Sequence, residues 1–135
     1  MTTDIWNPTQ KSIQSSYVIN MTFLQSIIQL MEDNDSLSVE SLLTHEEQQK
    51  HRFIMQLPKE QWFAIKDSLS VDDIHLLIKF FTLAEMQFSD WTGKEKSPVI
   101  WLTKILRQKG KILEKELLLW IKENSSNKFL PYGAL

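Results

Sequence analysis

The side chains best suited to chemistry in this sequence are its three histidines and the carboxylates beside them. The segment HEEQQKH places His45 and His51 six positions apart, so on a helix their rings point to different sides. A helical zinc-protease motif instead needs histidines four positions apart with a glutamate between them. We therefore predict that this segment is a solvated, charged helix turn and that neither histidine binds a metal.

His75 and Glu85 lie on the narrow polar stripe of the most apolar long segment, residues 71–89. Lys79 follows His75 by one helical turn, and a neighbouring cation makes a histidine a poor general base. Glu85 shares the same stripe, which favours a carboxylate in contact with water. Both residues are therefore expected to be surface positions without a catalytic role.

Other catalytic motifs are missing from the sequence. No glutamate precedes a histidine by three residues, as di-iron bundles require, and three isolated glycines cannot form a phosphate-binding loop. The Gly-x-Ser-x-Gly turn of serine hydrolases is absent too. The lack of cysteine excludes thiol catalysis, disulfides and zinc–thiolate sites. These absences favour a protein that is not an enzyme and holds no cofactor or metal.

Length and composition are those of a globular protein. The 135 residues, with 42% hydrophobic and 24% charged side chains, predict one domain spanning residues 1–135. The longest apolar run, residues 117–121, is far too short to span a membrane. The early Asp4 in MTTDIWNPTQ argues against a signal peptide. The expected location is the cytoplasm, away from membranes.

Helical periodicity and cap residues predict an all-α bundle of about six helices. Apolar residues recur every three or four positions, and no segment alternates as a strand would. Caps include the pairs Thr44–Glu47 and Ser70–Asp73, Ser97 before Pro98, and Gly110 after the fifth helix. The predicted helices cover about residues 11–31, 45–56, 58–69, 71–89, 98–109 and 113–124.

The helix at residues 71–89 is expected to lie at the centre of the bundle, because apolar side chains cover most of its circumference. Its narrow polar stripe contains Asp72, His75, Lys79, Thr82, Glu85 and Ser89. Residues 1–10 are expected to form an N-terminal arm, and residues 125–135 an extended apolar tail. The polar break at residues 124–127 lets this tail turn back, so we favour a tail folded onto the bundle over a free docking peptide.

Two apolar features exceed what a lone bundle of this size needs. They are the run LLLWI at residues 117–121 and the tail NKFLPYGAL. Either the tail, a second copy of the chain or another protein must cover this surface. We therefore predict a small protein-interaction module, an adaptor or regulator, with a homodimer formed through the C-terminal helix and tail as one form of it. The predicted partner-binding residues are Leu118, Leu119, Phe129, Leu130 and Tyr132.

The distribution of charge supports an alternative function. Residues 1–90 contain six Lys/Arg and thirteen Asp/Glu, a net −7, whereas residues 91–135 contain nine and four, a net +5. A basic C-terminal third with two consecutive helices is typical of nucleic-acid-binding regulators. The residues that would contact phosphates are Lys104, Arg107 and Lys111. Acidic side chains on the last helix disfavour sequence reading in the major groove, so this alternative ranks below protein binding.

Overall fold

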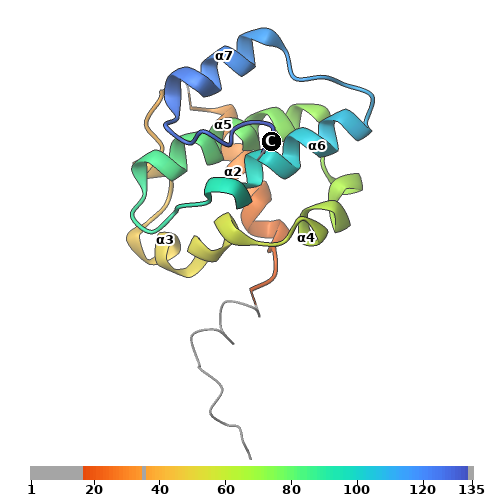
Figure 1. Cartoon of the computed structure of the whole chain (residues 1–135). Coiled ribbons are helices and arrows are strands. Elements are labelled where there is room, and N and C mark those ends of the chain that lie inside the picture. Colours follow the sequence, from red (N-terminus) through yellow and green to blue (C-terminus); the bar gives the residue numbers. More distant parts are fainter. Residues whose placement is uncertain (1–16, 35, 134–135) are drawn as a thin grey trace, which may run out of the picture.

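The computed structural model describes residues 17–34 and 36–133, and within them the chain forms helices and no strand (Figure 1). The all-α bundle of about six helices is thereby confirmed. The α-helices are α2 (Met21–Glu32), α3 (His45–His51), α4 (Lys59–Ala64), α5 (Val71–Gln87), α6 (Pro98–Gln108) and α7 (Lys115–Asn124). Short 3-10 helices connect them, namely η2 (Glu40–Leu42), η3 (Arg52–Gln56), η4 (Lys66–Ser68) and η5 (Lys94–Lys96).

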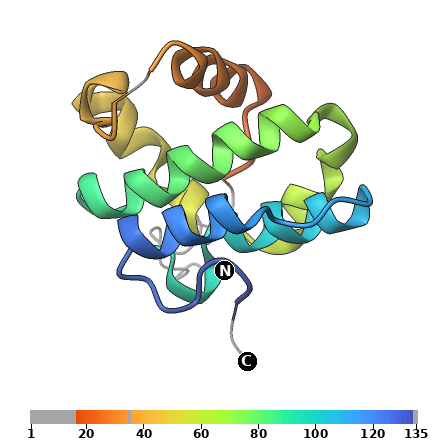
Figure 2. The same cartoon turned by 90° about the horizontal axis from the view of Figure 1, so that it is seen from above.

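Helix α5 is the centre of the bundle, as its apolar circumference predicts. It packs against α6, α2 and α7, and Figure 2 shows α2 and α7 on opposite sides of it. Aromatic rings gather around its second half: Phe81 meets Trp62 edge to face, and Phe80 meets Trp91 in the same way. Such aromatic pairs add to the stabilisation that comes from buried apolar area.

The helix ends follow the caps that the sequence predicts. Thr44 with Glu47 and Ser70 with Asp73 form reciprocal capping boxes at the starts of α3 and α5. At the end of α6, Gly110 adopts a left-handed φ of 82° and its N–H donates to the Arg107 carbonyl at 2.9 Å. The next N–H, of Lys111, reaches the Leu106 carbonyl at 3.1 Å, which completes a Schellman motif.

The predicted helix boundaries are wrong at the N-terminal side of α2. The helix begins at Met21, because the Asn20 side chain caps it by accepting the Phe23 N–H at 3.1 Å. Before Asn20 the backbone is bound to α4 instead: Gln61 accepts from the Ile19 N–H and donates to the Tyr17 carbonyl. Predicted helix residues 11–16 and the arm at residues 1–10 lie outside the described residues.

Thr82 corrects the predicted polar stripe of α5. Its side chain is fully buried, and its hydroxyl donates to the Ile78 carbonyl one turn earlier at 2.7 Å. A hydroxyl satisfied within its own helix can be buried at little cost, so α5 is closed to water on this side as well. The helix also ends at Gln87, two residues before the predicted end.

Candidate functional site

The C-terminal tail folds back onto the bundle. Leu130 is only 3% exposed and Pro131 is buried beside it. The Gly133 N–H donates to the Phe129 carbonyl at 2.6 Å, and Gly133 takes a left-handed φ of 92°. A Cβ at Gly133 would lie 3.3 Å from the Ile100 Cγ2, so the tail lies against α6 at Gly133. The described tail therefore covers part of the core.

Glu85 joins the tail to α5 and to the loop before η5. Its Oε2 accepts the backbone N–H groups of Gly93 at 2.8 Å and Lys94 at 3.0 Å, and its Oε1 accepts the Asn127 side-chain amide at 3.0 Å. The same Asn127 amide nitrogen donates to the Lys94 carbonyl at 3.1 Å. Glu85 is half-buried and fully engaged, so the expectation of a carboxylate facing water is wrong. The three donors come from segments up to 42 positions away, which periodicity cannot reveal.

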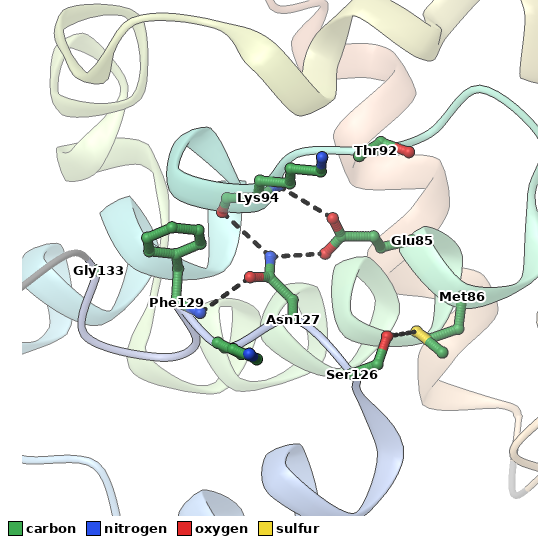
Figure 3. A pocket seen from close by; sticks show the side chains of 9 residues that line it. Glu85, Met86, Thr92, Lys94, Ser126, Asn127, Phe129 and Gly133 are labelled. Atoms are coloured by element: carbon green, nitrogen blue, oxygen red, sulfur yellow. Dashed lines mark hydrogen bonds between the residues drawn. The ribbon is translucent and has the colours of Figure 1, made fainter.

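Around these hydrogen bonds lies a groove of about 680 Å³. In Figure 3 the side chains of Met86 and Phe129 lie to the two sides of the Glu85–Asn127 pair, and Asn127 points toward both Glu85 and the Lys94 carbonyl. Met86 is 48% exposed although it is apolar. We call this feature the tail groove; it is lined by Glu85, Met86, Thr92, Lys94, Ser126, Asn127, Lys128, Phe129 and Gly133.

We expect Glu85→Ala to lower the free energy of unfolding by about 1–2 kcal/mol, because three N–H donors lose a charged acceptor in a half-buried place. Amide hydrogen exchange at Gly93 and Lys94 should accelerate as well. The matched control is Gln87→Ala, which removes hydrogen bonds to Val39 and Leu37 on another part of α5. Equal acceleration at Gly93 in both variants would contradict the assigned role of Glu85.

The predicted partner-binding residues divide into buried and exposed sets. Leu130 belongs to the core, and Leu118 is half-buried against it. Phe129 is half-buried and lines the tail groove. Tyr132 and Leu119 are 46% and 49% exposed.

Most of the apolar run in α7 is buried or half-buried against the rest of the bundle. Ile121 is fully buried, while Leu117 and Trp120 are half-buried against the core. Within α7, Leu119 is the apolar residue that faces outward. Of the apolar surplus predicted from the sequence, Leu119, Tyr132 and the tail groove therefore remain accessible.

The basic residues of the alternative function lie on the surface. Lys104 and Arg107 are exposed on α6, and Lys111 is exposed just beyond its end. Residues 111–114 connect α6 to α7 without a tight turn. The exposed positions of α7 alternate in charge, with Lys115 and Glu116 followed by Lys122 and Glu123.

No protein-family model matches this chain, and searches of the curated proteins and of the solved structures return no significant match. The candidate site therefore rests on its own geometry. Over residues 17–34 and 36–133, histidine and acidic side chains nowhere gather in threes as a metal site would need. In the same part of the chain, every helix is too short or too polar to cross a membrane.

His51 is buried, which corrects the prediction of a solvated turn. Its ring is 6% exposed and stacks on Phe23 with the ring centroids 3.6 Å apart. The Tyr17 hydroxyl lies 2.7 Å from the His51 Nδ1. Burial lowers the pKa of His51, helped by the neighbouring charge of Lys50, and burial raises the pKa of Tyr17 to about 12. His45, at the start of the same helix, is exposed as predicted.

The shifted pKa values of His51 and Tyr17 predict that the free energy of unfolding decreases both at acidic and at strongly alkaline pH. As pH falls below about 6.5, the unfolded chain protonates His51 before the folded protein does, so stability is lost down to the lowered folded pKa. As pH rises from about 10 to about 12, the unfolded chain ionises Tyr17 first, and stability is lost again. Urea unfolding across this range should show both declines.

The variant His51→Asn tests whether His51 causes the loss of stability at acidic pH, because an amide does not titrate. Between about pH 7 and about pH 5, its free energy of unfolding should fall less than that of the wild type. His45→Asn, on the exposed first turn, serves as the matched control and should follow the wild type. Parallel curves for wild type and His51→Asn would exclude His51 as the titrating group.

Proposed function

We propose that this protein is a small non-enzymatic interaction module that docks an extended peptide segment of a partner in the tail groove. The observation that carries the proposal is an open hollow of about 680 Å³ with Met86 half-exposed on one side and Phe129 on the other. Ligand sites typically have this size, with apolar walls and a few polar groups that set orientation.

The polar groups of the tail groove suit a peptide ligand. Lys94 and Lys128 are exposed cations beside it, while the Glu85 carboxylate already accepts hydrogen bonds from three N–H donors. An apolar or aromatic anchor would contact Met86 and Phe129, and a carboxylate next to that anchor would meet the lysines. The preferred ligand is therefore a segment with an apolar anchor flanked by Asp or Glu.

A random peptide library displayed on phage and selected against the full chain tests this proposal. Selected peptides should carry an aromatic or aliphatic anchor beside acidic residues. Met86→Glu should weaken the binding of the synthetic peptides by about tenfold or more in fluorescence anisotropy, since a hydrophobic contact is replaced by a like charge. Met86→Leu keeps the apolar wall and should bind as the wild type does. Peptides that bind Met86→Glu unchanged would refute the groove as their site.

Self-association is a second form of the same function, favoured by the half-exposed apolar Leu119 on the outer face of α7. If the exposed apolar side chains of α7 and the tail pair two copies, light scattering should report a dimer that Leu119→Glu dissociates. Lys122→Gln, on the same outer face, is the charge-matched control, because it also lowers the net charge by one, and it should leave the dimer intact. A monomer at all concentrations would leave a foreign partner as the ligand.

Nucleic-acid binding by Lys104, Arg107 and Lys111 remains the alternative, favoured by their exposure on and just after α6. A gel shift with duplex DNA discriminates the two functions. Phosphate contacts by three cations would weaken binding steeply between about 50 and about 200 mM salt, and the triple glutamine variant would abolish it. No shift at the lower salt concentration would exclude this alternative.

A further inference from the structure

The connection between α6 and α7 carries one exposed apolar side chain among lysines. We infer that it attaches this protein to the surface of a membrane that contains anionic lipids. Ile112 enters the interface between headgroups and acyl chains, and the cations around it contact the charged headgroups. We call this feature the basic tip; it consists of Lys104, Arg107, Lys109, Lys111, Ile112 and Lys115.

Ile112 is held outward on an anchored segment. Its side chain is 81% exposed, more than any other large apolar side chain in the part of the chain that the structure describes. Leu113, the next residue, is 8% exposed and belongs to the core. Before Ile112, the N–H groups of Gly110 and Lys111 donate to carbonyls of the last turn of α6. The bundle therefore fixes the segment on both sides of Ile112 and leaves this side chain uncovered.

Basic side chains surround Ile112. Residues 104–116 contain five Lys/Arg, all exposed, against the carboxylates of Glu114 and Glu116, a net +3. The Lys66 Nζ lies 3.4 Å from the Gln108 Oε1 and adds a cation at the end of α6. Clusters of about four to eight Lys/Arg are attracted to anionic lipid surfaces, and each cation near the surface strengthens binding by roughly fivefold.

The apolar side chain favours a membrane over nucleic acid as the anionic partner. The phosphates of a duplex would contact Lys104, Arg107 and Lys111, but they would leave Ile112 in water. A bilayer interface accepts both kinds of group, and apolar insertion combined with a polybasic patch binds more tightly than either signal alone. The expected location away from membranes follows from the lack of a spanning segment, which a surface contact does not require.

The basic tip and the tail groove lie at opposite ends of α5. Glu114 lines a hollow with His75 and Lys79, near the start of α5, whereas Glu85 and Met86 of the tail groove lie near its end. Figures 1 and 2 show the connection between α6 and α7 at the outer edge of the bundle, on the side away from α3. A membrane at the basic tip would therefore leave the tail groove accessible.

Sedimentation of the full chain with lipid vesicles tests the charge requirement. At about 100 mM salt, vesicles of phosphatidylcholine with about 30% phosphatidylserine should bind at least about tenfold more protein than phosphatidylcholine alone. Lys109→Gln with Lys111→Gln should lower the partition coefficient by about tenfold or more. The charge-matched control, Lys50→Gln with Lys96→Gln, removes exposed cations from α3 and η5 and should lower it by less than about threefold.

The variant Ile112→Gln tests insertion into the membrane. It should lower the partition coefficient by about fivefold or more, because the apolar side chain no longer leaves water. Leu37→Gln changes another exposed aliphatic side chain, 54% exposed, in the segment before η2, and it should bind as the wild type does. Because the chain has no native cysteine, Ile112→Cys can carry an environment-sensitive fluorophore, whose emission should shift to the blue with the anionic vesicles.

Two results would overturn the inference. One is equal binding, or none, with vesicles that contain phosphatidylserine and vesicles that lack it. The other comes from a parallel measurement with duplex DNA. If Lys109→Gln with Lys111→Gln weakens binding to DNA and to vesicles alike while Ile112→Gln weakens neither, the basic tip is a surface for phosphates in general and Ile112 does not enter the bilayer.

Discussion

Replacing Leu130 by Ala is expected to lower the free energy of unfolding by about 3 kcal/mol. Leu130 belongs to the C-terminal tail, yet its side chain is 3% exposed and is part of the hydrophobic core. Truncation to Ala removes buried apolar area and leaves a cavity that the neighbouring side chains only partly fill. Urea unfolding at neutral pH, with intrinsic tryptophan fluorescence as the signal, measures this loss.

Tyr132→Ala is the matched control for Leu130→Ala. Tyr132 lies two residues further along the same tail and is 46% exposed, so its replacement should change the free energy of unfolding by less than about 0.5 kcal/mol. A free docking peptide would give two equally small effects. The expected difference would instead establish that the tail contributes to the stability of the bundle while offering Tyr132 and Phe129 at its surface.

Gly93→Ala should also destabilise the protein by about 3 kcal/mol, but for a different reason. Gly93 has φ −108° and ψ −39°, which alanine adopts without strain. A Cβ there, however, would lie 2.8 Å from the Ser97 Cα and 2.9 Å from the Met55 carbonyl oxygen. Both are backbone atoms, so the loop before η5 would have to move away from η3. That movement would also disturb the N–H groups that Glu85 holds beside the tail groove.

Gly110→Ala separates steric from conformational cost. Gly110 has a left-handed φ of 82°, but its missing side chain has nothing within 4 Å. The expected loss is about 1 kcal/mol, from forcing an L-residue into the left-handed region. Chemical denaturation of Gly93→Ala and Gly110→Ala compares the steric cost at Gly93 with the conformational cost at Gly110. If Gly93→Ala costs no more than Gly110→Ala, the close approach of the two backbones is not rigid.

Local signals predict much of this fold because short-range physics governs them. The capping boxes of α3 and α5, Pro98 as the first residue of α6 and Gly110 after its end all depend on contacts within a few residues. The apolar circumference of residues 71–89 likewise predicts a central helix. Where a distant segment competes with a local preference, the prediction is wrong. The chain before Asn20 is bound to Gln61 instead of continuing α2 towards its N-terminus.

The residues of the candidate site likewise divide into those that the sequence predicts and those that it does not. Phe129 is a predicted contact residue and lines the tail groove, whereas no signal in the sequence distinguishes Met86 from the other apolar residues of α5. The polar break at residues 124–127 predicts that the tail turns back, but it does not predict that the Asn127 amide links Glu85 to the Lys94 carbonyl. No spacing rule connects these residues, because they come from separate parts of the chain.

By itself, the sequence determined the helical class, the central helix, most helix ends and the absence of known catalytic motifs, since periodicity and capping act over one or two turns. Only the tertiary structure decided that His51 is buried beside Tyr17 and that Glu85 accepts hydrogen bonds from the tail and from the loop before η5. It also decided that one part of the tail belongs to the core while another part lines the tail groove. These features depend on packing between residues 34 to 42 positions apart. Such packing follows from how whole helices fit together, which no local pattern encodes.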